Sequence, residues 1–336
     1  MTVDTSKIIG IGHSQHQGAR DYQEDSFSVS ELGKDKYLLA LADGMGGHVG
    51  GARASEIAVE AALSPLPEMP EDEDQTVENQ ASAADALTQR MRIANSAISA
   101  CLEAEPELEG MGCTLVLLSV SSRGYQFSSV GDSPLWLLRN DELVRMNADH
   151  SMAPVLEDMV LAGRITPEEA KVDPRRNALR SALTGEDIDL LDVSEEIIGA
   201  EPGDIFLLAS DGLETLNQGQ IIDILKRSEE NASEKCARLI TAVLAEETEN
   251  QDNVSVMVMK YDDLYGSDFA TVATAAPEVM ENLELEEAVT KPLARPSHQV
   301  KMESKKSKKP ALIFCALLLL LLIILTFLFR SEIGSA

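Results

Sequence analysis

The sequence is poor in cysteine and histidine, with four cysteines and five histidines among 336 residues. The cysteines stand at positions 101, 113, 236 and 315 and show neither a CxxC spacing nor a paired framework. This pattern argues against a disulfide scaffold and favours a reducing compartment. With so few imidazoles and thiols, any metal site is expected to be built from carboxylates.

Basic residues are also scarce, because 28 Lys and Arg stand against 57 Asp and Glu, for a formal net charge of -29. A polyanion cannot release counterions by neutralising phosphates, so we expect no nucleic-acid partner. Most of the excess acid serves solubility. The informative carboxylates are those beside glycines at the ends of apolar runs.

One long apolar run, ALIFCALLLLLLIILTFLF at 311–329, contains no charged residue, glycine or proline. As a helix it would be about 28 Å long, close to the roughly 30 Å hydrocarbon core of a bilayer. A buried core helix is the alternative, but core helices are seldom apolar on every face. The run therefore predicts a single transmembrane helix that contacts the lipid bilayer.

A basic cluster precedes this run, whereas only Arg330 follows it. The cluster consists of Lys301, Lys305, Lys306, Lys308 and Lys309. The positive-inside rule then places the preceding chain in the cytoplasm and predicts a single-pass protein of the inner (cytoplasmic) membrane. The same lysines can also bind anionic headgroups.

The domain organisation follows from the change in composition near Asp263. Residues 1–262 are expected to form one folded domain, and 263–310 a disordered linker that ends in the basic cluster. The transmembrane helix at 311–329 and a short tail at 330–336 complete the chain. Within the first domain, the acidic, proline-containing segment 65–78 is expected to be a surface loop.

Short apolar runs alternate with helical patterns in the folded domain. Strands are predicted at 36–43, 113–121, 125–132, 134–140, 204–211 and 253–261. Helices are predicted at about 51–63, 81–104, 154–162, 218–228 and 232–247. Strands 113–121 and 125–132 are separated by about three residues, which indicates an antiparallel hairpin. The fold class is therefore α+β, with packed antiparallel sheets and helices outside.

Three aspartates lie at the ends of such strands. Asp43 precedes Gly44 in LALADGMGG, Asp211 precedes Gly212 in FLLASDGLE, and Asp252 opens the strand QDNVSVMV. Asp-Gly is a common turn dipeptide, so one alone would indicate only a turn. Several at strand edges favour a shared site for a hard Mg or Mn ion.

Eight motifs in order resemble those of the PPM, or type 2C, protein phosphatases in their bacterial form. The motifs are GARDYQEDSF (18–27), LADGMGGHVGGARAS (41–55), MGCTLV (111–116), VGDSPLW (130–136), ADHSM (148–152), GRITPEEAKVDPRRNALRSALTG (163–185), LLASDGLETL (207–216) and QDNVSVMV (251–258). The resemblance covers roughly residues 8–261. It implies a four-layer αββα sandwich of two antiparallel sheets flanked by helices.

The resemblance also implies a centre of two Mg or Mn ions in the cleft between the sheets. Asp43 resembles the carboxylate that bridges both ions, and the Gly44 carbonyl resembles a ligand of one. Asp211 and Asp252 would complete the other shell. The remaining roles are carried by Glu24 and Asp25, which would hold metal-bound waters, by Arg20, which would grip the substrate phosphate, and by Asp132, which would hold a third, weaker ion.

The implied activity is hydrolysis of phosphoserine and phosphothreonine on proteins, by a water or hydroxide that bridges the two ions. Phosphorylated proteins are the implied substrates, and a bacterial Ser/Thr kinase is the implied antagonist. An arginine at position 20 suits this chemistry, because a guanidinium can donate to two phosphate oxygens at once. The alternative is a catalytically weak phosphoprotein-binding module on the same fold.

The sequence departs from the family pattern at several positions. Met45 stands where animal relatives have a histidine after the bridging Asp-Gly, so a general acid is missing there. His48 could replace it, although a packing role is the simpler interpretation. The arginine usual after the GDS motif is Pro134, and the histidine of the flap's HPxRN pattern is Asp173. These changes affect loops and substrate contacts more than the metal ligands.

Overall fold

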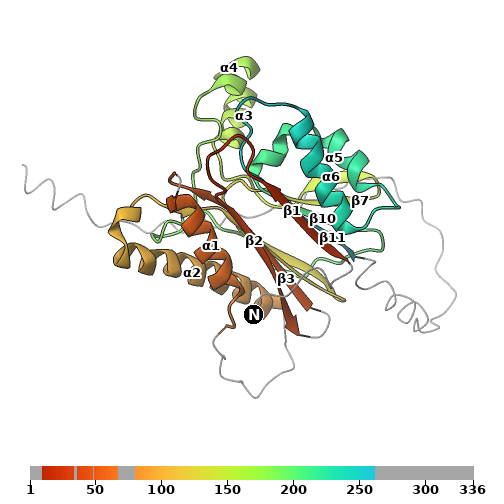
Figure 1. Cartoon of the computed structure of the whole chain (residues 1–336), viewed down its shortest axis with the longest axis horizontal. Coiled ribbons are helices and arrows are strands. Elements are labelled where there is room, and N and C mark those ends of the chain that lie inside the picture. Colours follow the sequence, from red (N-terminus) through yellow and green to blue (C-terminus); the bar gives the residue numbers. More distant parts are fainter. Residues whose placement is uncertain (1–9, 34–35, 48, 67–79, 262–336) are drawn as a thin grey trace, which may run out of the picture. The chain divides into compact units, whose positions relative to one another are not determined.

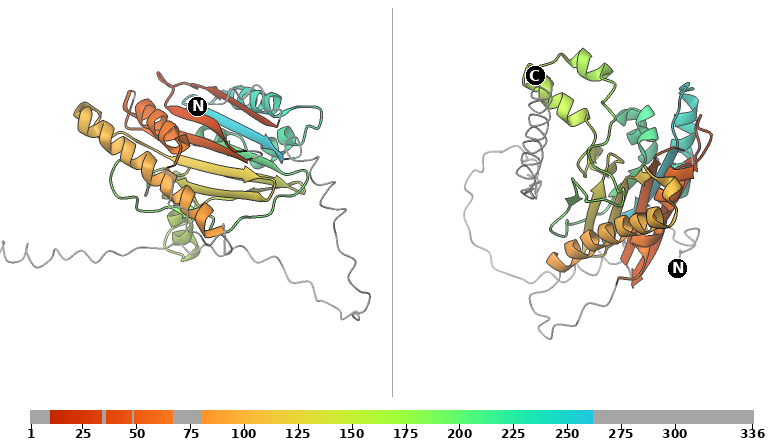
Figure 2. Two further views of the ribbon diagram at one scale, coloured as in Figure 1. Left: turned by 90° about the horizontal axis from the view of Figure 1, so that it is seen from below. Right: turned by 90° about the vertical axis from the view of Figure 1, so that its left-hand side faces the viewer.

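The structure, a computed structural model, describes residues 10–33, 36–47, 49–66 and 80–261. All of them belong to the unit Met1–Pro292. In this unit two antiparallel sheets pack face to face, and helices cover their outer faces (Figures 1 and 2). The predicted α+β class, with two antiparallel sheets flanked by helices, is confirmed.

Every strand pairing in the two sheets is antiparallel. The first sheet has the order β1 (Ile11–His16), β11 (Val254–Lys260), β10 (Ile205–Ala209), β7 (Leu135–Arg139), β8 (Glu142–Arg145). The second has the order β2 (Asp25–Gly33), β3 (Lys36–Met45), β5 (Leu115–Ser121), β6 (Gly124–Val130), β9 (Asp192–Val193), with β4 (Gly112–Cys113) also paired to β3.

The helices fall into three groups. On the second sheet lie α1 (Val49–Leu63) and α2 (Gln80–Ala104), and on the first lie α5 (Gln218–Leu225) and α6 (Ala232–Ala245). The flap, residues 153–185, contains α3 (Ala153–Leu161) and α4 (Pro167–Val172), which project at the top of Figure 1. The short 3-10 helices are η2 (Pro106–Leu108) and η3 (Asp211–Thr215).

Three hydrophobic layers explain why the central strands are apolar throughout. Along β3, Leu39 and Leu41 face the other sheet, whereas Leu38 packs under α1 and α2. Along β10, Phe206 faces inward and Leu207 packs under α5 and α6. An antiparallel sheet usually keeps one polar, solvated face, but here helices cover both outer faces. The four-layer arrangement therefore produces uninterrupted apolar runs.

The sequence-based boundaries agree with the structure for the central elements and fail at the edges. The six predicted strands correspond to β3, β5, β6, β7, β10 and β11, and the five predicted helices to α1, α2, α3, α5 and α6. Strands β1, β2, β8 and β9 were not predicted. The burial patterns of β1 and β2 are interrupted, and β8 and β9 have only four and two residues, so hydrophobic periodicity is weak.

The predicted membrane helix at 311–329 and the linker at 263–310 lie outside the described residues. Across 10–33, 36–47, 49–66 and 80–261, no helix combines the length and apolar character needed to cross a bilayer.

Candidate metal centre

Four acidic residues lie at one edge of the two sheets because neighbouring strands begin or end there. Asp25 opens β2 and pairs in register with Asp43 near the end of β3. Asp211 follows β10 and Asp252 precedes β11, and these two strands are antiparallel neighbours. Residues far apart in the chain are thus delivered to one place.

The register of β2 with β3 and the pairing of β10 with β11 bring these acidic residues near one another, and burial adds to the effect of their charges. Burial raises the pKa of Asp43 well above its ordinary value, and the charges of four neighbours raise it further. The four neighbours are Asp25, Asp211, Asp132 and Asp252. Burial, followed by Asp132 and Asp252, raises the pKa of Asp211 to about 7. Like charges gathered in a desolvated place disfavour ionisation unless a cation neutralises them.

Two buried carboxylate oxygens in this group, Asp25 Oδ1 and Asp211 Oδ1, have no hydrogen-bond partner among the residues that the structure describes. The other oxygen of Asp25 accepts a hydrogen bond from Ser210 Oγ at 2.8 Å. Burial raises the pKa of Asp25 to about 6, although the Ser210 bond opposes the shift. Unpartnered buried carboxylate oxygens are costly, and a hard cation is the partner that satisfies them.

The backbone around Asp43 is fixed by hydrogen bonds to a neighbouring strand. The Asp43 N–H donates to Thr114 Oγ1 at 2.9 Å, and the Thr114 N–H donates to the Asp43 carbonyl at 2.8 Å. The Thr114 hydroxyl is also 2.7 Å from Ser133 Oγ, beside Asp132. Thr114 therefore links the loop of Asp132 to the end of β3.

Gly44 lies where β3 meets α1, and no side chain fits there. A Cβ at Gly44 would stand 2.1 Å from the Gly51 carbonyl oxygen and 2.6 Å from that of Glu24. The Gly44 N–H donates to the Glu24 carbonyl at 3.1 Å, and Ser55 Oγ donates to the same carbonyl at 2.6 Å. These two bonds hold the backbone of Glu24 beside the end of β3, next to Asp43.

Arg20 lies at the exposed rim of the cluster. Its Nη2 is 2.5 Å from Asp252 Oδ2, and about half of the Arg20 side chain is exposed. Asp252 Oδ1 accepts a hydrogen bond from the Asn253 N–H at 2.8 Å. An exposed guanidinium beside the carboxylates is placed to meet an anion that approaches from solvent.

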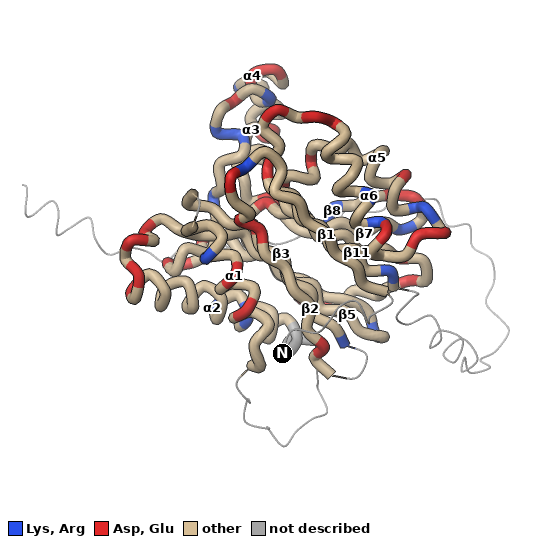
Figure 3. Tube along the Cα trace, viewed as in Figure 1, with Lys and Arg blue, Asp and Glu red and all other residues tan. Residues whose placement is uncertain are grey.

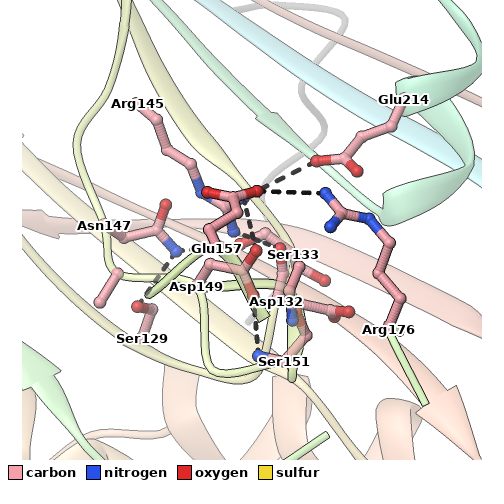
Figure 4. Close-up of polar contacts among 12 residues, drawn as sticks. Ser129, Asp132, Ser133, Arg145, Asn147, Asp149, Ser151, Glu157, Arg176 and Glu214 are labelled. Atoms are coloured by element: carbon pink, nitrogen blue, oxygen red, sulfur yellow. Dashed lines mark hydrogen bonds and ion pairs between the residues drawn. The ribbon is translucent and has the colours of Figure 1, made fainter. Parts of the chain in front are cut away.

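Asp132 follows β6 and lies in a second group of charges (Figure 4). Burial and the charge of Asp149 raise its pKa to about 6, while Arg145 opposes the shift. The adjoining backbone is tied to His150, whose Nδ1 accepts a hydrogen bond from the Gly131 N–H at 3.2 Å. His150 thus has a structural role, and burial lowers its pKa.

The donors of this cluster suit magnesium or manganese. They are carboxylate oxygens, which these ions prefer over nitrogen or sulfur. Within the part of the chain that the structure describes, no three His, Cys, Asp or Glu side chains already surround one point at ligand spacing. Magnesium bound by protein carboxylates commonly keeps several waters in its coordination shell.

Comparison with protein families gives a match over most of the chain. The family model described as "Protein phosphatase 2C" matches residues 12–257. The chain belongs to the protein phosphatase 2C family. The motifs that suggested this resemblance all lie inside the matched region, apart from the final residue of QDNVSVMV.

Two bacterial phosphatases are similar to this chain. The chain is 39% identical over 222 residues to the serine/threonine protein phosphatase PstP of Mycobacterium tuberculosis, which covers 66% of this chain and 40% of PstP. It is 31% identical over 246 residues to the serine/threonine phosphatase stp of Listeria welshimeri, covering 72% and 91%. The chain thus spans about two fifths of the length of PstP.

Solved structures of the family have the same fold. The crystal structure of M. tuberculosis PstP is matched with a TM-score of 0.59 and 34% identity, over 74% of this chain and 97% of that one. A PstP catalytic domain in complex with two manganese ions is matched with a TM-score of 0.56 and 33% identity, over 74% and 96%.

Some residues of this type 2C site could not be selected from the sequence. Ser210 and Thr114 contact Asp25 and Asp43 through hydrogen bonds that join different strands. Arg145 and Glu214 contact the Asp132 region from β8 and η3. Thr114, Ser210 and Glu214 lie inside the quoted motifs and Arg145 lies outside them, but no local pattern marks the side chains of these four residues as contacts of the site. His48, the predicted substitute for the missing histidine, lies outside the described residues.

Proposed function

We propose that this chain hydrolyses phosphoserine and phosphothreonine on proteins with the help of two Mg or Mn ions. The observation that carries the proposal is the convergence of Asp25, Asp43, Asp211 and Asp252 at one strand edge, with two buried carboxylate oxygens unpartnered. Membership of the protein phosphatase 2C family supports the same activity.

The ligand roles are divided among these carboxylates. Asp43 bridges the two ions, and the Gly44 carbonyl binds one of them. Asp211 and Asp252 would complete the shell of the other ion, and Glu24 and Asp25 would hold metal-bound waters. The burial of Asp43 and the unpartnered oxygens of Asp25 and Asp211 support this assignment, as does the preference of hard ions for oxygen. Asp132 is the remaining carboxylate near Asp43 and Asp211.

Arg20 binds the phosphate of the substrate. Its guanidinium is at the exposed rim of the cluster, so a phosphoryl group entering from solvent meets it first. Two parallel N–H bonds to phosphate oxygens orient the phosphorus toward the carboxylates. When bound, the two ions acidify water and neutralise charge on the phosphoryl group.

Phosphatase assays on the full-length chain test the proposal. We expect hydrolysis of p-nitrophenyl phosphate and of a phosphothreonine peptide with Mn²⁺, and loss of both with a chelator. Asp43→Asn should lower kcat by at least about 100-fold, because the bridging charge is removed. Arg20→Lys should mainly raise KM for the phosphopeptide, because lysine keeps the charge but not the fork.

The alternative of a catalytically weak phosphoprotein-binding module makes opposite predictions for the same assays. Such a module would bind phosphopeptide without releasing phosphate at any Mn²⁺ concentration. Activity that is unaffected by Asp43→Asn and by the chelator would also refute the metal-dependent mechanism. The retention of an acidic residue at each predicted carboxylate position argues for the enzyme.

A bacterial Ser/Thr kinase and its substrates are the proposed physiological partners. A phosphatase of this specificity reverses phosphorylation on the same hydroxyl residues that such kinases modify. The flap carries Arg164, Arg175, Arg176 and Arg180, and Figure 3 shows basic and acidic segments in the chain around α3 and α4. The substrates can be sought as the phosphoproteins whose phosphorylation rises when Asp43→Asn replaces the wild-type chain in cells. The kinase is expected among them.

The chain is also proposed to be anchored in the inner membrane by 311–329, with the catalytic domain in the cytoplasm. The support comes from the uncharged run itself and from the lysines that precede it. The full-length chain should stay with membranes after alkaline carbonate extraction, whereas a chain ending at residue 310 should not. Release of the full-length chain by carbonate would refute the anchor.

A further inference from the structure

The loop 17–24, between β1 and β2, carries Arg20 and contains neither helix nor strand. It lies against the segment 251–253 that leads into β11, where the Ala19 N–H donates to the Gln251 carbonyl oxygen at 2.8 Å. Because a loop lacks the repeated hydrogen bonds of a helix or a sheet, a few individual bonds decide where its side chains stand. The place of the proposed phosphate-binding guanidinium therefore depends on these bonds.

The side chain of Asn253 makes three hydrogen bonds within the described residues, and all three go to this loop. Its Nδ2 donates to the carbonyl oxygens of Gln17 at 2.8 Å and of Tyr22 at 2.9 Å. Its Oδ1 accepts a hydrogen bond from the Glu24 N–H at 2.7 Å. Asn253 is only 3% exposed, so the loss of this amide would leave buried backbone groups unpaired.

These bonds hold the chain on both sides of Arg20. Gln17 precedes it and Tyr22 follows it, and Gln17 Nε2 also donates to the Arg20 carbonyl oxygen at 2.5 Å. The Arg20 side chain itself is restrained by an ion pair with Asp252, in which both partners are more than one third exposed. Exposed ion pairs are weak, so the backbone of the loop has the larger part in placing the guanidinium.

Asn253 also joins this loop to the metal centre. Its backbone N–H donates to Oδ1 of Asp252, a proposed ligand, at 2.8 Å. The loop approaches the same place closely, since a Cβ at Gly18 would stand 2.2 Å from the Asp252 carbonyl oxygen. One residue thus holds a carboxylate through its backbone and the arginine loop through its side chain.

We propose that Asn253 is a positioning residue, which sets the place of the Arg20 guanidinium relative to the carboxylates and thereby the affinity for the substrate phosphate. Two parallel bonds from a guanidinium to phosphate require a defined direction of approach, and a small displacement weakens both. Asn253 itself has no contact with the substrate. The inference rests on the proposed phosphatase activity.

Two substitutions of Asn253 separate its side-chain bonds from charge. Asn253→Asp keeps the size and the acceptor for the Glu24 N–H but removes both donors. Asn253→Ala removes all three bonds and adds no charge. Both keep the backbone N–H that holds Asp252.

The matched control is Asn147→Ala. Asn147 is 5% exposed, and it also accepts one hydrogen bond and donates two, but to a different part of the chain (Figure 4). Its partners are the Leu135 N–H, Ser129 Oγ and the Ser133 carbonyl oxygen. This variant loses as many buried bonds as Asn253→Ala without touching the loop 17–24.

Kinetics of the full-length protein with Mn²⁺, on p-nitrophenyl phosphate and a phosphothreonine peptide, give the first test. Both Asn253 variants should raise KM at least about tenfold while kcat falls less than about threefold. Asn147→Ala should lower Tm comparably and leave KM within about twofold of the wild type. In an Arg20→Ala background, Asn253→Ala should have little further effect on kcat/KM, because both changes act through one guanidinium.

Hydrogen–deuterium exchange in a chelator gives a second test that needs neither metal nor turnover. The segment 17–24 should exchange faster in both Asn253 variants than in the wild type or Asn147→Ala. Unchanged exchange, an unchanged KM, or an equal effect of Asn253→Ala with and without the Arg20 side chain would overturn the inference alone. A wild type without Mn²⁺-dependent turnover would instead refute the proposed function, and the exchange result would still decide whether Asn253 holds the loop.

Discussion

At Asp211, burial and four acidic neighbours act in the same direction. Burial contributes most to its raised pKa of about 7, followed by Asp132, Asp252, Asp25 and Glu214. Within the described part of the chain, Asp211 Oδ1 has no hydrogen-bond partner. The charge of Asp211 thus destabilises the metal-free protein. Functional sites often carry such a cost in stability.

Asp211→Asn should therefore make the metal-free protein more stable and the metal-bound protein less so. The amide has nearly the same shape and no charge, so repulsion falls. In a chelator, we expect Tm to rise by about 3 °C or more, which corresponds to roughly 1 kcal/mol for a domain of this size. The increase in Tm that Mn²⁺ gives the wild type should largely disappear.

The control for this experiment is Asp223→Asn, which changes an exposed aspartate on α5. It should alter neither Tm nor the response to Mn²⁺. A lower Tm for metal-free Asp211→Asn would show that the carboxylate stabilises the fold through contacts rather than straining it.

At the scale of elements, the junction between β3 and α1 is closed by a glycine. Gly44→Ala would place a methyl group 2.1 Å from the Gly51 carbonyl oxygen, so the end of β3 and the start of α1 must separate. We expect a loss of about 1–3 kcal/mol of unfolding free energy. Asp43 would shift as well, so phosphatase activity should fall by at least about tenfold.

The matched variant is Gly199→Ala, because nothing lies within 4 Å of a Cβ at that position. Urea unfolding and kinetic assays on both variants separate a local clash from a general effect of alanine. Equal behaviour of the two proteins would contradict the close packing at Gly44.

The pairing of α5 with α6 depends on a buried lysine. Lys235 of α6 is 1% exposed, and its Nζ donates to the carbonyl oxygens of Leu225 at 2.7 Å and of Arg227. These carbonyls lie at and beyond the C-terminal end of α5, where backbone acceptors lack helical partners. The lysine therefore caps one helix from the next.

Lys235→Met should leave these buried acceptors unsatisfied and destabilise the domain by about 1–3 kcal/mol. Lys226→Met is the comparison, because Lys226 forms an exposed ion pair with Asp141. Such pairs contribute at most about 1 kcal/mol. Chemical denaturation should rank the two variants in that order, and a neutral Lys235→Met would argue against the capping role.

For the whole molecule, the stability of the metal-free protein should fall as pH rises. The pKa values of Asp25, Asp132 and Asp211 are raised from an ordinary value of 3.8 to about 6, 6 and 7. The folded state therefore binds more protons than the unfolded state between about pH 4 and 7. Stability is greatest below this window and is lost as pH rises through it.

Thermal melts in a chelator from pH 5 to 8 should show a decreasing Tm. Saturating Mn²⁺ should reverse the trend, because ions bind the deprotonated carboxylates. Asp211→Asn should flatten the metal-free profile. A Tm that rises with pH in the chelator would contradict the raised pKa values of these carboxylates. It would mean that groups of the protein itself stabilise their charged forms.

The sequence by itself determined the apolar strands and helices of the interior, because their hydrophobic periodicity reflects burial between layers. The sequence also marked Asp43, Asp211 and Asp252 as candidate metal ligands, since an aspartate beside a turn residue at the end of an apolar strand is a local signal. The run at 311–329 and its lysines likewise give a prediction of a membrane anchor that needs no tertiary contact.

Only the tertiary structure decided which charges meet. β2, with its mixed burial pattern, gave no strand signal, yet its register with β3 sets Asp25 beside Asp43. Arg145, Asp149 and Glu214 lie on different segments, and nothing in the chain marks them as neighbours. Hydrophobic patterns are local and survive in one dimension, whereas electrostatic contacts depend on distances that exist only after the sheets have packed.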